Sequence, residues 1–170
     1  TLPDERREMP RPPGAERANL KGLKTATGSH RPTENSIYSA LLDPRLTWKE
    51  IEWLRSITKL PMVLKGVLNP EDAERAVEVG ASGIVVSNHG GRNLDTLPAT
   101  IDALPEVAAQ VAGRVPVLVY GGIRRGTDVL KAIALGASAT LIGRAYLFGL
   151  AVGGAEGVTR VVNILRREFE

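Results

Sequence analysis

The fold of this chain is decided by the stretch Gly83-Ile84-Val85-Val86-Ser87-Asn88-His89-Gly90-Gly91-Arg92. Its first part is short, apolar and rich in β-branched residues, which is typical of a buried strand in a parallel sheet. Its second part changes abruptly to polar and glycine residues, so the strand leads into a turn that carries chemical groups. If other strands end in the same way, their shared edge is a candidate functional site.

Three further apolar stretches end in this manner. Residues 62–64 lead to Lys65-Gly66, residues 115–119 lead to Tyr120-Gly121-Gly122, and residues 139–142 lead to Gly143-Arg144. Helical spacing of apolar residues and helix-starting residues predict helices between and around these strands. The predicted helices cover residues 47–60, 70–80, 99–112, 127–135 and 158–170.

An internal similarity supports this alternation of helices and strands. The sequence Ala-Val-Glu-Val-Gly-Ala-Ser at residues 76–82 resembles Ala-Ile-Ala-Leu-Gly-Ala-Ser at residues 132–138. Each copy reads as a helix end, a glycine terminator and the entry to an apolar strand. Strands that alternate with helices fit either a doubly wound sheet or part of a (β/α)8 barrel.

The position of the polar segments favours the barrel. Functional residues at the carboxyl end of every strand are how a (β/α)8 barrel builds its active site. The segments at residues 120–122 and 143–144 are glycine-rich or basic, as in the phosphate site that follows strands 7 and 8 of such barrels. We therefore predict an α/β fold in which residues 47–170 are strands 5 to 8 of a barrel, with their helices. Residues 1–46 are proline-rich and lack an apolar period, so they are predicted to form a loop segment.

Composition narrows the class of protein. The 170 residues are 43% hydrophobic and 24% charged, which is the mix of an ordinary globular domain. The net charge of +3 and the 4% of aromatic residues disfavour nucleic-acid binding, which uses a basic stripe with aromatic platforms. The absence of cysteine removes disulfides and thiol chemistry, and no metal site is predicted. No membrane span or secretory signal is expected, so the predicted location is cytoplasmic.

Three side chains at these strand ends could carry chemistry. His89 lies in a glycine-rich turn, and an imidazole exchanges a proton near neutral pH, as a general base must. Arg92 offers a planar fork that matches a carboxylate, and Lys65 places a cation at the barrel mouth. The alternatives are a loop histidine without a role, a surface arginine and a lysine that only reaches for solvent.

A second group could hold a phosphate. Gly121, Gly122 and Gly143 permit close backbone approach, and Arg124 and Arg144 supply positive charge. Adjacent side chains diverge, so Arg125 is expected to point away from the site.

These residues resemble the FMN-dependent 2-hydroxy acid oxidases and dehydrogenases, which include glycolate oxidase, lactate oxidase, mandelate dehydrogenase and flavocytochrome-type lactate dehydrogenases. The matching segments occur in the same order from about residue 4 to the C-terminus, and the Ser-Asn-His-Gly-Gly-Arg run is the most specific. They are Lys65-Gly66-Val67, residues 87–95, Pro98-Ala99-Thr100, residues 121–129 and Gly143-Arg144.

The resemblance implies a role for each position. Lys65 would face the flavin N1/O2 edge and stabilise the reduced ring, and Ser87 would contact the flavin. His89 would be the base in the oxidation of a small (S)-2-hydroxy acid to a 2-keto acid, and Arg92 would bind the substrate carboxylate. The ribityl chain and phosphate of FMN would be held by Gly121, Gly122, Ile123, Arg124, Gly143 and Arg144.

One position departs from the family pattern. The family has an aspartate immediately before the glycine pair, where it contacts the ribityl chain, and this chain has Tyr120. Tyr120 is therefore expected to contact the cofactor with a phenol in place of a carboxylate.

The resemblance also implies what lies around the site. Residues 1–46 would be the long loop after strand 4, and strands 1 to 4 would come from a second chain or from a preceding segment. The electron acceptor would be O2 or another oxidant, the assembly a homo-oligomer (a tetramer in the family), and the location peroxisomal in a eukaryote. Two alternatives remain: a non-catalytic subunit or fragment of such an enzyme, and a different phosphate-binding barrel.

Overall fold

A computed structural model describes residues 46–92 and 94–170 of the chain. The chain divides into two units, Thr1–Thr47 and Trp48–Glu170, and the second carries all the strands discussed below. The predicted loop at residues 1–46 lies almost wholly outside the described residues, so its structure stays a prediction.

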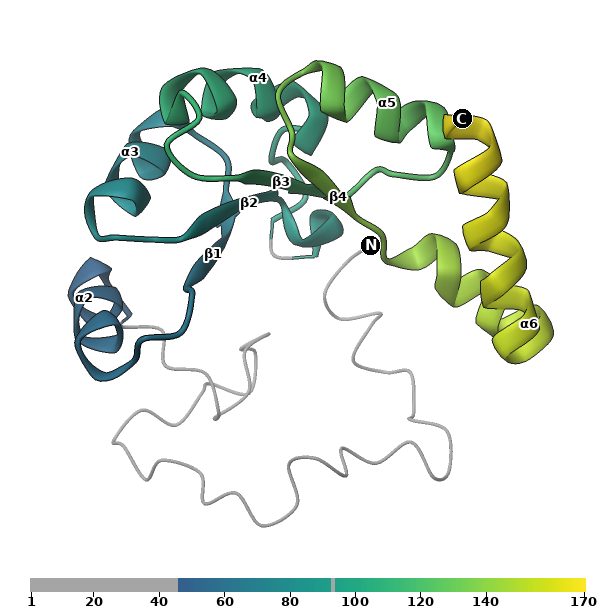
Figure 1. Cartoon of the computed structure of the whole chain (residues 1–170), viewed down its shortest axis with the longest axis horizontal. Helices are drawn as coiled ribbons and strands as arrows, with labels where there is room; N and C mark the ends of the chain where they lie inside the picture. The colour runs from purple at the N-terminus through teal and green to yellow at the C-terminus, as the bar shows by residue number, and fades with distance from the viewer. Residues whose placement is uncertain (1–45, 93) are drawn as a thin grey trace, which may run out of the picture. The chain divides into compact units, whose positions relative to one another are not determined.

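The second unit is built on a four-stranded parallel sheet (Figure 1). The strands follow one another in space in the order of the sequence, β1-β2-β3-β4. Their bounds are Val63–Val67 for β1, Gly83–Ser87 for β2, Val117–Tyr120 for β3 and Ala139–Leu141 for β4. The four predicted strands are confirmed, but their bounds differ from those predicted. β1 continues through Lys65 and Gly66 to Val67 instead of ending at Leu64, and β3 includes Tyr120.

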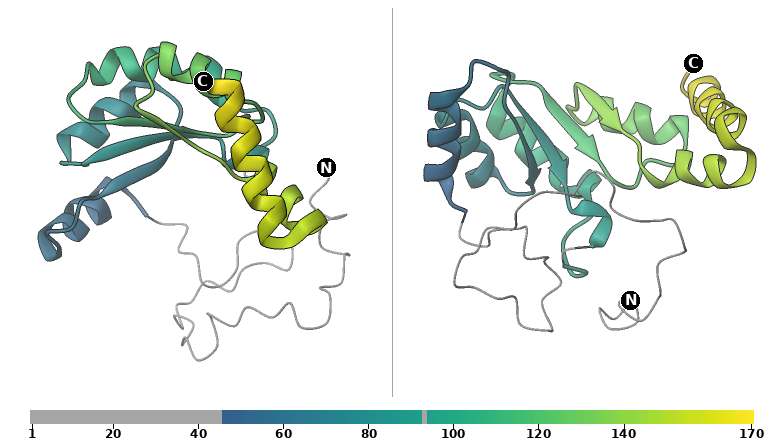
Figure 2. Two further views of the ribbon diagram at one scale, coloured as in Figure 1. Left: turned by 45° about the vertical axis from the view of Figure 1, so that its right-hand side comes forward. Right: turned by 90° about the horizontal axis from the view of Figure 1, so that it is seen from below.

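The helices identify which of the two predicted architectures the sheet belongs to. Their bounds are Trp48–Ile57 for α2, Pro70–Glu78 for α3, Thr100–Val111 for α4, Gly126–Ala134 for α5 and Arg144–Phe169 for α6, with a short 3-10 helix η2 at His89–Gly91. Helices α3, α4 and α5 cover the same face of the sheet (Figures 1 and 2). A doubly wound sheet has helices on both faces and a reversal of strand order. The sequential order with helices on one face is that of a barrel segment.

The face of the sheet beneath these helices, which we call the outer face, holds the core. Ile84, Val86 and Val119 are fully buried there and pack in one cluster with Leu104 and Val107 of α4. Burial of apolar area of this kind is the main stabilising term of a domain.

Alternate residues of the strands point to the opposite, inner face. The strand register aligns Lys65 with Val85, and Val85 with Leu118, in one row of this face. A second row, closer to the carboxyl ends of the strands, aligns Ser87 with Tyr120. Barrels stack inward residues in such layers, so the inner face presents part of a barrel interior.

The internal similarity corresponds to one repeated structure at the ends of α3 and α5. Gly80 and Gly136 adopt positive φ values of 80° and 104°, which favour glycine. In both copies a Schellman bond closes the helix and the following serine N–H then bonds to the neighbouring strand region. The closing bonds run from Ala81 N–H to Ala76 O and from Ala137 N–H to Ala132 O, each 3.0 Å. The entry bonds run from Ser82 N–H to Met62 O and from Ser138 N–H to Val117 O, each 2.7 Å.

The last helix differs from its prediction. The helix predicted at residues 158–170 is present, but its predicted start was wrong, because α6 begins at Arg144 and is kinked at Gly153 and Gly154. A Cβ on Gly149 would lie 2.6 Å from the Gly157 carbonyl oxygen, so the absence of side chains lets the two helical parts pack closely.

Across the part of the chain that the structure describes, no helix has both the length and the apolar character needed to cross a membrane.

Candidate active site

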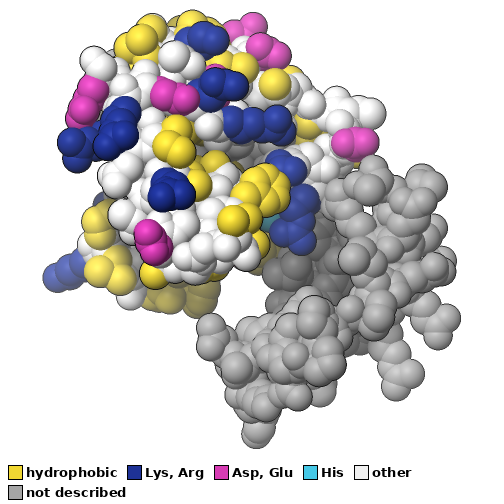
Figure 3. Space-filling view, turned by 90° about the vertical axis from the view of Figure 1, so that its right-hand side faces the viewer, with side chains coloured by type: hydrophobic (Ala, Val, Ile, Leu, Met, Phe, Trp, Pro, Cys, Tyr) yellow, Lys and Arg dark blue, Asp and Glu magenta, His cyan; other side chains and the backbone are white. Residues whose placement is uncertain are grey.

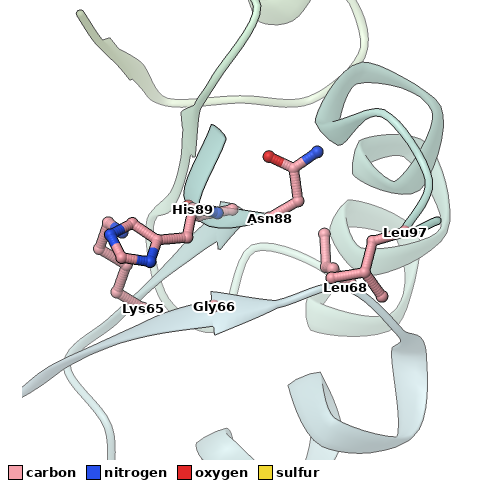
Figure 4. Close-up of a pocket in the computed structure, with 7 residues that line it drawn as sticks. Lys65, Gly66, Leu68, Asn88, His89 and Leu97 are labelled. Carbon is pink, nitrogen blue, oxygen red and sulfur yellow. The ribbon is translucent and has the colours of Figure 1, made fainter. Parts of the chain in front are cut away.

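A pocket of about 220 Å³ opens at the carboxyl ends of β1 and β2 (Figure 4). The side chains of Lys65 and His89 extend to the same side of this pocket, whereas Asn88 points away from them. The lining residues are Lys65, Gly66, Leu68, Ser87, Asn88, His89 and Leu97. The structure therefore brings together three of the predicted site residues: the cation, the buried hydroxyl and the histidine.

The turn that carries His89 has an unusual backbone. His89 has a φ of 56°, and Gly90 and Gly91 follow with φ values of 66° and 72°. A left-handed conformation is uncommon for a residue with a side chain and has an unfavourable energy of order 1–3 kcal/mol. Such strain persists only where the surroundings fix the conformation.

Two polar side chains fix this turn. The Ser87 hydroxyl, which is 2% exposed, accepts a hydrogen bond from the His89 N–H at 3.1 Å. The Asn88 side-chain oxygen accepts from the Gly90 N–H at 3.0 Å, and its amide nitrogen donates to the Pro98 carbonyl at 3.1 Å. The strand end thus holds the histidine backbone in place.

The roles of Asn88 and Thr100 were not predicted from the sequence. Thr100 is the first residue of α4, is 3% exposed, and donates its hydroxyl proton to the Gly121 carbonyl at 3.1 Å. Asn88 and Thr100 together connect the turns after β2 and β3 to the start of α4. Both stand inside the family-like segments, which was the only signal that could have found them.

Tyr120 lies across the inner face at this edge. The Lys65 ammonium nitrogen is 4.7 Å from the centroid of the Tyr120 ring, within the range of a cation–π contact. At the other end of the ring, the Tyr120 hydroxyl oxygen lies 2.6 Å from where a Cβ on Gly143 would be. Any larger residue at position 143 would therefore displace the tyrosine.

The start of α5 is occupied by the chain's own carboxylates. Asp128 accepts hydrogen bonds from the N–H groups of Arg124 at 3.0 Å and Arg125 at 2.9 Å. These bonds, that from Arg124 first, lower the pKa of the Asp128 carboxyl below its usual value. Glu168 of α6 accepts from the Gly126 N–H at 2.9 Å. The backbone N–H groups of residues 124–126 are thus already hydrogen-bonded to carboxylates of the chain. A ligand at this edge would instead approach the backbone of the glycine turn that precedes them.

The remaining predicted residues are distributed around this edge. Arg144 donates to the Gly90 carbonyl at 3.2 Å, which joins the end of β4 to the His89 turn. The Ile123 side chain is buried in the core and does not line the pocket. Arg92 and Arg124 are exposed and are not among the residues that line the pocket. Arg125 forms an ion pair with Glu168 of α6 at 3.9 Å.

The side of the molecule formed by α5 and α6 is chemically mixed. Basic side chains lie on it with apolar side chains between them (Figure 3). Several of the apolar residues of α6 are strongly exposed, among them Phe148 at 67% and Val152 at 91%.

Comparison with known proteins places this geometry in a family. Residues 3–170 match the family model described as FMN-dependent dehydrogenase. The chain is 52% identical to an L-lactate oxidase from Nostoc sp. over 98% of its own length and 46% of the relative. It is 58% identical to a peroxisomal (S)-2-hydroxyacid oxidase from Arabidopsis thaliana, over 89% of the chain and 42% of the relative. It therefore spans about half the length of the curated relatives it matches.

Solved structures agree with the sequence relatives. A mandelate oxidase crystallised with (S)-2-phenylpropionate superposes with a TM-score of 0.70 and 54% identity, over 72% of this chain and 37% of that one. A mandelate oxidase with benzoyl-formic acid superposes with the same TM-score. The four strands are thus part of a (β/α)8 barrel, as the sequence predicted. The chain belongs to the FMN-dependent dehydrogenases, a family of oxidoreductases whose cofactor is FMN.

Proposed function

We propose that this chain provides the flavin- and substrate-facing part of an enzyme that oxidises a small (S)-2-hydroxy acid to the 2-keto acid. The observation that carries the proposal is His89, held in a strained left-handed conformation at a pocket that it shares with Lys65 and Ser87. Strain that the surroundings maintain is characteristic of functional positions. The relatives named as L-lactate oxidase and (S)-2-hydroxyacid oxidase support the substrate class.

The residues at this edge fit FMN. Lys65 supplies a cation and Ser87 a hydroxyl where the isoalloxazine ring would lie. Gly122, with a φ of 76° and nothing within 4 Å of its Cβ position, leaves open space for close approach to the backbone. When bound, FMN supplies the acceptor for the two electrons removed from the substrate.

The phosphate end of FMN is assigned to the opposite part of the edge. Backbone groups of Gly121, Gly122 and Ile123 would face the ribityl chain, together with the Tyr120 phenol. Gly143, Arg124 and Arg144 would hold the phosphate, because arginine pairs with phosphate oxygens in a bidentate manner.

His89 and Arg92 act on the substrate in this proposal. Arg92 pairs with the carboxylate and fixes the orientation of the hydroxy acid. Conversion of the C2 hydroxyl to a carbonyl removes two protons and two electrons from the substrate. His89 takes one proton, and the two electrons would pass to bound FMN, with the second hydrogen leaving C2 either with them or as a separate proton. The Ser87 and Asn88 hydrogen bonds keep the histidine backbone fixed during this transfer.

The assembly and acceptor are inferred from the family. O2 or another oxidant reoxidises the flavin, and the working protein is a homo-oligomer in which strands 1 to 4 complete the barrel. Relatives named peroxisomal support a peroxisomal location in a eukaryote, and a cytoplasmic location is proposed otherwise.

An anaerobic titration tests the proposal. The FMN-loaded protein is mixed with (S)-lactate, glycolate or (S)-mandelate, and flavin absorbance is followed. At least one acid should bleach the flavin, while (R)-lactate and (R)-mandelate serve as matched controls and should leave it oxidised. A flavin that stays oxidised with every acid would contradict the proposal and favour a non-catalytic subunit.

A further inference from the structure

We propose that Tyr120 is a positioning residue for Lys65: its ring holds the lysine ammonium at the pocket without cancelling its charge. This inference rests on the proposed function for its consequence at the flavin. The contact itself is a property of the chain and can be tested independently.

The geometry requires the lysine to reach across the sheet. Lys65 is on β1 and Tyr120 is on β3, so the side chain passes over β2 on the inner face. Its own row contains Val85, and Tyr120 lies in the next row toward the carboxyl ends. The ammonium nevertheless lies 4.7 Å from the ring centroid, which indicates that the ring determines where this long side chain ends.

The ring can act as a fixed platform. Tyr120 is half-buried, and its strand pairs with β2 on one side and β4 on the other. Its hydroxyl end rests against Gly143. A tyrosine has two side-chain torsions, whereas a lysine has four and is intrinsically mobile. The mobile partner is therefore held by the rigid one.

The chemistry of the contact explains why a ring differs from a carboxylate here. An aspartate within reach of Lys65 would form an ion pair, and the pair would carry no net charge. The face of an aromatic ring attracts the cation through its quadrupole and leaves the positive charge in place. With Tyr120, the full charge of Lys65 faces the pocket that contains Ser87 and His89.

Lysine-methyl NMR on the full chain tests the contact directly. Reductive ¹³C-dimethylation labels each lysine, and the Lys65 signal is assigned from its absence in Lys65→Arg. Because the ammonium lies over an aromatic face, this signal should be shifted upfield of the other lysines. Tyr120→Phe should keep the shift, and Tyr120→Leu should abolish it. A Lys65 signal that is unchanged by Tyr120→Leu would overturn the proposal.

A reciprocal variant covers the case in which Tyr120→Leu fails to fold. Lys65→Met removes the cation from an exposed side chain and should move the Tyr120 ring signals, whereas Lys59→Met at an exposed control site should not. Unchanged ring signals in Lys65→Met would also overturn the proposal.

The consequence at the flavin has its own measurement. The reduction potential of bound FMN should change least in Tyr120→Phe, which keeps the ring but loses the hydroxyl, and should become more negative in Tyr120→Leu and Tyr120→Asp. Equal potentials in all variants would refute the charge argument. A protein that keeps the NMR signature but is bleached by no hydroxy acid would refute the proposed function alone.

Discussion

The outer face of the sheet and its carboxyl edge differ in burial and in backbone conformation. On the outer face Ile84, Leu104 and Val107 are fully buried, and helix ends repeat the same hydrogen bonds. At the edge, His89 adopts a strained left-handed conformation and Lys65 is exposed. In this half of the barrel, the residues that stabilise the fold and the residues proposed to carry the chemistry therefore lie on different sides of the sheet, as they generally do in barrels. Changes on one side should therefore leave the other untouched.

The largest expected effect is on turnover, from a change at the edge. Asparagine tolerates the left-handed conformation of residue 89 but cannot act as the base. His89→Asn should lower kcat for the 2-hydroxy acid about 10²–10⁴-fold, the usual contribution of a general base. Steady-state kinetics of the FMN-loaded protein would measure this, and the Tm should stay within a degree or so of the parent. A variant that retains turnover would show that His89 is not the base.

A change on the outer face should have the opposite profile. Leu104→Ala removes a fully buried side chain and should lower the free energy of unfolding by about 2–5 kcal/mol. Denaturant unfolding of the chain measures this. Leu130→Ala, at a leucine that is 54% exposed on α5, is the matched control and should change stability by less than about 0.5 kcal/mol. Equal effects of the two substitutions would mean that the outer face is not the core.

A smaller effect on stability is expected from relieving backbone strain, and it distinguishes strain at the proposed site from strain elsewhere in the fold. Ala112 ends α4 with a φ of 50°, close to that of His89. Ala112→Gly relieves this strain and should raise the unfolding free energy by roughly 0.5 kcal/mol, after the greater freedom of glycine in the unfolded chain is subtracted. Thermal unfolding and turnover are measured together. His89→Gly should gain similar stability but lose activity; loss of activity in Ala112→Gly would contradict the separation.

The same contrast explains how much could be predicted from the sequence. The strands and the repeated helix ends at residues 76–82 and 132–138 depend on local patterns, and they were found. That Lys65 and His89 meet at one edge followed from a single rule, that parallel strands end together. Ser87 was named only through the family resemblance, and Arg92, which was expected beside them, does not line the pocket.

What the sequence could not predict depends on contacts between distant residues. The Tyr120–Lys65 contact joins strands that are not neighbours, and only the register brings the two side chains together. The early start of α6 was missed because close packing at Gly149 is a tertiary effect that local propensity does not contain. The hydrogen bonds that Asp128 accepts from the backbone before α5 were not predicted, because the helix dipole alone explains an acid in a first helical turn.

The smallest expected effect concerns a surface ion pair on the outer side of the sheet, and its size depends on pH. Glu74 of α3 forms an ion pair with Arg114, which follows α4, and also accepts from Gln110. Hydrogen bonding to the Arg114 side chain first, and then to Gln110, lowers the pKa of Glu74 from 4.5 to about 2. A carboxyl whose pKa is lower in the folded chain stabilises the fold at pH values above its unfolded pKa, and it loses that contribution as pH falls toward about 2.

Glu74→Gln should therefore have a lower Tm than the parent at pH 7, and the difference should vanish near pH 2. Glu71→Gln on the same helix is the charge-matched control. A Tm difference between the parent and Glu74→Gln that does not change between pH 7 and pH 2 would show that the pair adds nothing. Because the pair is exposed and remote from the pocket, FMN binding should be unaffected at any pH where the chain is folded.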